Sequence, residues 1–560
     1  MRKSKIVGLC LLLGMLGGCA QVGTITGGEK DTKPPVILSQ TPENNSTQFH
    51  GDEIHITFDE FVELVNPEQN FIISPATQEK PQYNLRGKSL IIDLKKCQLD
   101  SNTTYIINCK GGIKDYTEGN ILPTKNIVFS TGDYIDSLSY KGNLKNAFTL
   151  ENINEAAILL HTTNEDSTLY NTAPSYVAFT DKNGNFEFSH LPNQQFYVSV
   201  ISEKTSDFLY NQTDELVGFC DSMITPYYIN KNDSLLDETS LPQIQLYAFQ
   251  EVDTNVKFLR KEFSGNFIHK LTFKNKVYDF SLLQISSLDT VIHYLYEKNP
   301  TMDTLMIYFL DTIDYTFDFQ LVVNGNGMDT ISLNPGQKAK GLRQRKTDEP
   351  KINYLRAGNY QDGNLFQKQR IAFNAPVKQY TDFQFMVVNT KDSLSDTNFV
   401  NWYFVDSIHR IIEIDYDFYQ ENTTYKILCP DSLIFDYYGT FNDSISMTIT
   451  TKSHRDFSHL TIAYQFYQQS HYIVELLNEK GTVIQKDFIE YNQKIEYKHL
   501  VPGKYKSRVI VDDNNNGIWD CGNYLQRIQP EKVTYCSKVF EVLANWKHEE
   551  TFDVVISKPE

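Results

Sequence analysis

Long apolar runs and excess positive charge are both missing from this sequence. Beyond its first residues it has no stretch of about 18 or more apolar residues, the length that a membrane-spanning helix requires, so a polytopic membrane protein is excluded. Its 52 Lys and Arg stand against 70 Asp and Glu, which leaves a net charge of −18. Because an acidic surface of this kind repels polyanions, we expect no nucleic-acid partner.

Recognisable catalytic patterns are also absent. The sequence contains no GxSxG, no P-loop and no dinucleotide-binding fingerprint, and it lacks the CxxC or Cys/His clusters that bind zinc. His454 and His459 are close in sequence but have no carboxylate pattern beside them. Asp59, Glu60 and Glu63 could serve a glycosidase, but they follow a predicted strand and are interpreted as a solvated loop. The sequence therefore predicts a protein that is not an enzyme.

What the sequence does contain is a succession of short strand signals. Runs such as Ile54–Phe58, Leu90–Leu94, Thr104–Ile107 and Ile127–Phe129 are β-branched or aromatic and are separated by Asn, Gly, Asp and Pro. Helical periodicity is hard to find. At about 150 residues per domain, 560 residues correspond to about three to five domains. We therefore predict an all-β chain of tandem β-sandwich domains.

The first residues have the three parts of a secretion signal. Arg2, Lys3 and Lys5 form a basic start, Ile6–Leu16 is apolar or glycine, and the chain turns polar from Gln21. The apolar run is too short to span a bilayer. We interpret residues 1–18 as a signal peptide.

The end of this segment, Leu16-Gly17-Gly18-Cys19, resembles the lipobox of bacterial lipoproteins. The resemblance implies that Cys19 becomes the acylated first residue of the mature chain, with palmitate among its acyl chains and the lipid bilayer as partner. The alternative is an ordinary signal peptide with an incidental cysteine. The expected location is the outer membrane of the cell envelope. Ala20–Thr26 has no acidic cluster resembling a surface-export signal, so a periplasm-facing and a cell-surface position both stay open.

One motif occurs twice in the chain. The sequence NTTY occupies Asn102–Tyr105 and Asn422–Tyr425, and in both places a cysteine follows at the same spacing. Self-similarity of this kind needs no outside comparison. It predicts two copies of one β domain, over residues 37–133 and 356–455.

The first copy carries a family resemblance. Several of its segments resemble bacterial Ig-like domains near the start of lipoproteins in Bacteroidota. They are the tether, the segment after the second predicted strand, the NTTY motif and the turn that follows this motif. These segments are Gly27–Pro35, Phe58–Val62, Asn102–Tyr105, Lys114–Tyr116 and Gly119–Asn120. The resemblance implies a seven-stranded sandwich and an envelope location rather than a reaction. It is weaker in the second copy, where Tyr438-Gly439-Thr440 replaces the Gly-Asn turn.

A second type of module also occurs twice. Thr180–Phe188 reads as strand, Gly-containing turn and strand, with Leu191-Pro192 behind it, and Leu500–Tyr505 repeats the Leu-Pro-Gly-Tyr step near the C-terminus. Both resemble transthyretin-like, carboxypeptidase-regulatory-like sandwiches. The block between the two types is strand-rich and includes the hairpin dipeptide Asn324-Gly325.

Together these patterns predict a linear series of domains. They are a signal peptide (1–18), a lipidated tether (19–36), an Ig-like domain (37–133), a transthyretin-like sandwich (134–247), a β domain of uncertain type (248–355), a second Ig-like domain (356–455) and a C-terminal transthyretin-like domain (456–560).

One segment has the ligand spacing of a calcium loop. In the pattern D-x-N-x-N-G-x-x-D, the side-chain oxygens of Asp512, Asn514, Asn516 and Asp520 and the carbonyl of Ile518 would surround one cation. The glutamate that an EF-hand-like loop places twelfth is missing, because Asn523 stands there. The alternative is an Asx turn between two strands. Calcium is the only cofactor that the sequence suggests.

The cysteines leave their state open. After Cys10 in the signal and Cys19, six remain, and the local candidates for disulfides are Cys97 with Cys109 and Cys521 with Cys536. The alternative is that they are buried free thiols.

The leading function is therefore a non-catalytic, membrane-anchored envelope lipoprotein that acts as a structural or interaction scaffold. The alternative is a glycan-binding lipoprotein beside an outer-membrane importer, in which some of the 34 Tyr would stack on sugars. An envelope protein or a glycan is the expected partner.

Overall fold

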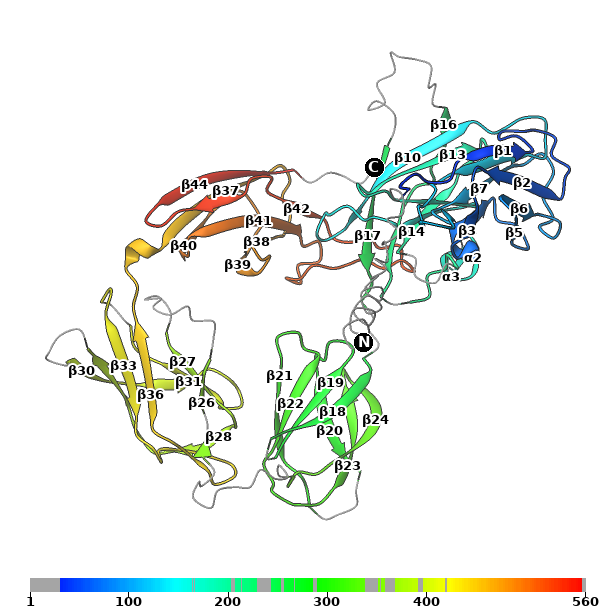
Figure 1. The fold of residues 1–560 in the computed structure, drawn as a ribbon. Helices are drawn as coiled ribbons and strands as arrows, with labels where there is room; N and C mark the ends of the chain where they lie inside the picture. The colour runs from blue at the N-terminus through cyan, green and yellow to red at the C-terminus, as the bar shows by residue number, and fades with distance from the viewer. Residues whose placement is uncertain are drawn as a thin grey trace, which may run out of the picture. The chain divides into compact units, whose positions relative to one another are not determined.

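The computed structural model is built almost wholly of β-strands (Figure 1). It describes residues 31–163, 165, 167–202, 207–212, 214–228, 243–252, 256–265, 267–285, 290–337, 351–352, 354–357, 368–390, 396–417 and 420–555. The described chain forms two compact units, one from residues up to 145 with 151–248 and one from 146–150 with 249 onward. Within these residues, no helix has the length and apolar character to cross a membrane. The predicted all-β fold of tandem sandwiches is confirmed.

The first module of unit 1 is a sandwich of short antiparallel sheets, in the orders β1-β2-β6-β5, β4-β7-β9 and β3-β8. Its elements are β1 (Ile37–Thr41), β2 (Glu53–Phe58), β3 (Val62–Leu64), α2 (Pro67–Asn70), β4 (Phe71–Ser74), β5 (Gln82–Arg86), β6 (Ser89–Asp93), β7 (Thr104–Cys109), β8 (Ile113–Asp115) and β9 (Asn126–Ser130). In β2 the side chains of Ile54, Ile56 and Phe58 alternate with more exposed ones and enter the core. This period of two places one face of the strand inside.

The second module of unit 1 is an eight-stranded sheet with the order β12-β11-β14-β15-β17-β10-β13 and β16 beside β10. Its elements are β10 (Leu138–Asn146), β11 (Ala157–His161), α3 (Thr168–Asn171), β12 (Tyr176–Phe179), β13 (Asn185–Leu191), β14 (Tyr197–Ile201), β15 (Leu216–Phe219), β16 (Tyr227–Tyr228) and β17 (Gln243–Gln250). Every residue of β11 is buried, so both of its faces are covered. Gly184, at φ +75°, lies in the turn between β12 and β13, as predicted.

Unit 2 begins with a sandwich of two sheets, β18-β19-β22-β21 and β20-β23-β24. Its strands are β18 (Phe258–Gly265), β19 (Ile268–Phe273), β20 (Phe280–Gln284), β21 (Tyr294–Lys298), β22 (Thr304–Phe309), β23 (Phe317–Val323) and β24 (Asn326–Leu333). Asn324 and Gly325 join β23 to β24 with φ of 51° and 78°. Positive φ at both positions is the type I′ hairpin geometry that this dipeptide favours, which confirms the predicted hairpin.

The next module has three sheets, β26-β27-β32-β31, β30-β29-β33-β36 and β25-β35-β34-β28. Its strands are β25 (Lys351–Ile352), β26 (Tyr354–Ala357), β27 (Arg370–Phe373), β28 (Val377–Tyr380), β29 (Phe385–Asn389), β30 (Asp396–Val400), β31 (Trp402–Phe404), β32 (Ile411–Ile414), β33 (Thr424–Cys429), β34 (Ile434–Asp436), β35 (Phe441–Asn442) and β36 (Ile445–Thr450), and the 3-10 turn η2 (His454–Asp456) follows.

The repeated motif NTTY has the same local structure in both copies. It leads into β7 in one and into β33 in the other, after an asparagine with φ of 52° or 50°. Thr103 N–H donates to Thr131 Oγ1 and Thr423 N–H donates to Thr451 Oγ1, both at 3.0 Å. The motif tyrosine also accepts a backbone N–H through its hydroxyl in each copy, at 2.7 and 3.3 Å. The self-similarity of the sequence thus corresponds to a shared structure.

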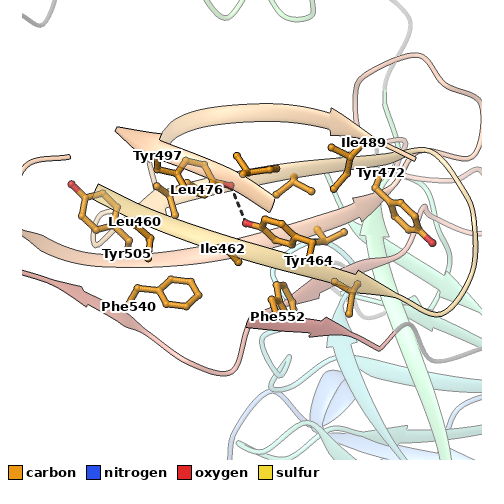
Figure 2. Packing of buried hydrophobic residues seen from close by; sticks show 14 of the residues in the cluster. Leu460, Ile462, Tyr464, Tyr472, Leu476, Ile489, Tyr497, Tyr505, Phe540 and Phe552 are labelled. Carbon is orange, nitrogen blue, oxygen red and sulfur yellow. Dashed lines mark hydrogen bonds between the residues drawn. The ribbon is translucent and has the colours of Figure 1, made fainter. Parts of the chain in front are cut away.

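The C-terminal module packs the sheet β40-β37-β44 against the sheet β39-β38-β41-β42, with β43 beside β41. Its strands are β37 (Ser458–Phe466), β38 (Tyr472–Asn478), β39 (Val483–Ile489), β40 (Gln493–Leu500), β41 (Gly503–Val511), β42 (Val533–Tyr535), β43 (Phe540–Val542) and β44 (Lys547–Val554). Figure 2 shows the aromatic and aliphatic core between them. The hydroxyl of Tyr464 lies 2.9 Å from that of Tyr497 and 2.8 Å from Ser507 Oγ, so these buried polar atoms satisfy one another.

The same module holds a buried ion pair. Glu475 on β38 and Arg508 on β41 are paired in register and are only 6% and 8% exposed. Arg508 Nε donates to Glu475 Oε2 at 2.8 Å, and Nη2 contacts the same oxygen. Arg508 Nη1 donates to the Tyr535 hydroxyl at 3.1 Å, so much of the guanidinium is hydrogen-bonded.

Separate hydrophobic clusters lie in different parts of the described chain. They span 49–129, 140–248, 271–333, 371–449 and 460–554. Apart from Ala248 in the second cluster, each cluster falls inside a different predicted domain, while the predicted boundaries themselves stay predictions. A module with its own core can fold without its neighbours.

The described cysteines are all free, so neither candidate disulfide is formed. Burial raises the pKa of Cys109 and of Cys429 to about 12. Thiols of this kind stay protonated and act as small apolar core residues.

Candidate functional site

The predicted site residues fall into two groups. Cys19 lies outside the described residues, so its acylation stays a prediction. Asp512, Asn514, Asn516, Ile518 and Asp520 lie together in the loop that follows β41.

Asp512 anchors the start of this loop. It is 1% exposed, and its carboxylate accepts two backbone N–H groups, Asn516 N–H at Oδ1 (3.0 Å) and Gly517 N–H at Oδ2 (2.9 Å). Gly517 has φ +76°, a conformation that residues with a side chain rarely adopt. The aspartate and the glycine of the motif therefore both serve the sharp turn.

The two asparagines close the loop further. Oδ1 of Asn514 accepts Asn516 N–H at 3.1 Å, and Oδ1 of Asn516 accepts Ile518 N–H at 2.9 Å. Their Nδ2 atoms donate to Asp520 Oδ2 at 2.5 and 2.8 Å. These are the hydrogen bonds of Asx turns, the alternative interpretation of the motif. To ligate a cation, each amide would rotate so that Oδ1 instead of Nδ2 faces Asp520.

A carboxylate that the motif does not include joins the loop. Glu531 is 6% exposed, and it accepts Asp513 N–H at Oε1 (2.9 Å) and Asp520 N–H at Oε2 (3.0 Å). Burial raises the pKa of Glu531 to about 7, and the nearby charges of Asp520 and Asp512 add to the rise. Its carbonyl also accepts Trp519 Nε1–H at 2.9 Å.

Sequence reasoning missed Glu531 because it lies beyond the twelve-residue span of an EF-hand-like loop. Asn523, the residue at the twelfth position, belongs to a separate turn in which its Oδ1 accepts Gln526 N–H at 2.8 Å. The structure thus brings Asp512, Asp520 and Glu531 to one loop. Hard oxygen ligands of this type suit calcium chemically.

A second acidic group lies in the first module. One oxygen each from Glu60, Asp115 and Glu118 lie within 4.8 Å of one another. Asp115 accepts N–H groups from Glu118 (2.5 Å), Gly119 (2.9 Å) and Asn120 (2.7 Å). Burial favours the neutral acid, but these donors prevail and hold the pKa of Asp115 at about 2.

Asp115 therefore has a structural role in the turn after β8. The equivalent Asp436 accepts Tyr438 and Thr440 N–H groups, both at 2.8 Å, after β34. The loss of the Gly-Asn pair in the second copy leaves this turn in place. Burial, followed by the charge of Asp115, raises the pKa of the neighbouring Glu60.

Comparison with known proteins agrees with the class that the sheets define, a modular all-β protein. Residues 31–131 match the family model of the bacterial Ig-like domain, so the chain contains such a domain at its described N-terminal end. No curated protein matches the sequence significantly.

Several solved structures resemble the chain weakly. The Bacillus anthracis TIE protein is 10% identical, with 95% of this chain and 76% of that chain covered and a TM-score of 0.15. BcpA, the major pilin subunit of Bacillus cereus, is 7% identical over 74% of this chain and 99% of its own, with a TM-score of 0.16. The surface-layer protein SbsC (domains 1–6) is 11% identical, with 90% of this chain and 67% of that chain covered and a TM-score of 0.14. TM-scores this low carry no functional argument.

Proposed function

We propose that this protein is a non-catalytic, lipid-anchored scaffold of the bacterial cell envelope, in which tandem β-sandwich modules present an interaction surface. The single observation that carries the proposal is the series of separate hydrophobic cores, because such modules can extend a chain without one shared core. The Ig-like match begins at residue 31, shortly after the lipobox-like Cys19 and its tether. Acyl chains on Cys19 would hold the modules on the outer membrane.

The anchor is tested by Cys19→Ser. Acyl transfer needs the thiol, so the variant is expected to carry no label from radiolabelled palmitate and to leave the membrane fraction. The buried Cys109, replaced by serine in the same way, is the matched control, because a core thiol takes no acyl chain. Membrane partition and label that persist in the Cys19 variant would contradict the lipid anchor.

We also propose that the Asp512–Asp520 loop binds calcium weakly, with Glu531 as the acid that the EF-hand-like pattern lacks. Asp512 and Asp520 lie at the two ends of the turn, and Glu531 accepts the N–H groups of Asp513 and Asp520, which supports this role. Rotation of two asparagine amides gives up two backbone hydrogen bonds, which offsets part of the binding free energy.

Calcium at a hundredfold above its Kd is expected to stabilise the unit that holds the loop by about 2.7 kcal/mol. In a thermal scan of the full chain, the corresponding transition should move up in millimolar calcium relative to chelator. Asp512→Ala should abolish the shift. Asp513→Ala should keep it, because the exposed Asp513 side chain is not among the proposed ligands. Equal melting temperatures of the unchanged protein in calcium and chelator would leave the loop as a plain Asx turn.

A further inference from the structure

Unit 1 contains a cleft between its two modules. Its volume is about 700 Å³, within the range of about 300–1,000 Å³ that small-molecule sites occupy. One wall comes from the sheet β4-β7-β9, and the other comes from β12, β13 and the turn between them. The exposed residues Thr124, Asn126, Asn154 and Glu155 lie along its lining, so solvent reaches the cleft.

The inner part of the cleft is apolar and aromatic. Ile106, Tyr176 and Phe188 are buried, and Phe179 is half-buried. Lys110 Nζ lies 3.6 Å from the centroid of the Phe179 ring, so a cation from one module covers the ring of the other. Burial lowers the pKa of Lys110, and Glu155 partly offsets this.

Amides provide half of the neutral polar side chains in the lining, from Asn70, Asn108, Asn126 and Asn154. Asn108 Nδ2 donates to Asn126 Oδ1 at 3.0 Å. Oδ1 of Asn108 has no hydrogen-bond partner within the described part of the chain. Side-chain amides both donate and accept, which suits a ligand whose groups also do both.

The charges in the cleft nearly balance. Lys110 and Lys182 stand against Glu155, Asp181 and Glu187. Two of these carboxylates already have partners. Glu187 lies 3.6 Å from Lys141 Nζ, and Asp181 accepts two backbone N–H groups of its own turn at 2.8 Å. The lining therefore selects neither a strongly anionic nor a strongly cationic ligand.

We propose that this cleft binds a neutral carbohydrate of one or two sugar units. Hydroxyl groups of a sugar would pair with the asparagine amides and the rim carboxylates, and its C–H face would lie against the half-buried Phe179. The activity goes beyond the scaffold role, because it gives the modules a ligand of their own. Failure of carbohydrate binding would leave the anchored scaffold untouched.

The experiment is saturation-transfer difference NMR on the full chain, with a panel of neutral mono- and disaccharides at millimolar concentration. At least one neutral sugar is expected to bind. Asn126→Trp, which places an indole at the cleft, is expected to weaken that binding at least tenfold. Asn326→Trp, the same change at an exposed strand start in unit 2, should leave binding unchanged.

Phe179→Leu keeps an apolar side chain while removing the ring, and it is expected to weaken binding as well. If circular dichroism shows that Asn126→Trp does not fold, the Phe179→Leu variant alone tests whether the sugar binds in the cleft. The proposal is overturned if no neutral sugar binds at millimolar concentration, or if neither cleft variant changes the binding.

Discussion

Glu475→Ala is expected to lower the free energy of unfolding of the C-terminal module by about 3–5 kcal/mol, the cost of breaking a buried ion pair by removing one partner. The carboxylate is 6% exposed and receives the Arg508 guanidinium at 2.8 Å. Its removal leaves a cation that is 8% exposed without its counter-charge. The desolvation of that cation, rather than the strength of the pair, is the source of the effect.

Denaturant unfolding of the full chain measures the change. The double variant Glu475→Leu with Arg508→Met should recover most of the loss, because an apolar pair of similar size has no charge to desolvate. Glu496→Ala is the matched control. It breaks an ion pair with Lys498 in the same module, where both side chains are about 60% exposed, at 62% and 61%, and the change should be near zero. A Glu475→Ala variant as stable as the Glu496→Ala variant would contradict this account.

Unit 1 is expected to lose about 3 kcal/mol of stability between about pH 6.5 and pH 4 through one histidine. His161 on β11 is 3% exposed, and its Nε2 has no hydrogen-bond partner within the described residues. Burial lowers its pKa from 6.5 to about 4. Below pH 6.5, His161 binds a proton in the unfolded chain but stays neutral in the folded unit. Protonation therefore favours unfolding. The stabilisation is complete above pH 6.5 and disappears as the pH falls towards 4.

Carboxylates titrate in the same interval, so the effect is read as a difference between proteins. His161→Phe should flatten the part of the pH dependence that lies between pH 6.5 and 4, while His50→Gln, at an exposed position of the same unit, should keep it. The measurement is the free energy of unfolding at each pH. If the free energy of unfolding has the same slope against pH in the unchanged protein and in His161→Phe, His161 is not the source of this pH dependence.

Much of the fold could be predicted because its signals are local. NTTY marks β7 and β33 by placing a positive-φ asparagine, two threonines and a tyrosine at one strand start, and the partners of the first threonine and of the tyrosine recur at the same spacing. Asn324-Gly325 predicts its hairpin because both residues tolerate φ above zero. The cysteines, in contrast, could not be assigned from spacing, and the structure has them free.

The candidate site was only partly visible in the sequence. Asp512, Gly517 and Asp520 follow from one short pattern, but Glu531 joins them only because the chain returns to the loop before β42 (Val533–Tyr535). The cleft of unit 1 is less local still, since Asn108 and Phe179 belong to different modules. No spacing in the sequence links such residues.

The sequence by itself determined the all-β class, the repeated NTTY motif, the motif of the loop and the lipobox-like start, because each is carried by short runs of neighbouring residues. Tertiary structure alone decided that Glu475 meets Arg508, that His161 is buried, that Glu531 completes the acidic loop and that amides line a cleft. The physical reason is that desolvation and the pairing of charges depend on which strands pack together. That packing is set by the whole core rather than by any local run of residues.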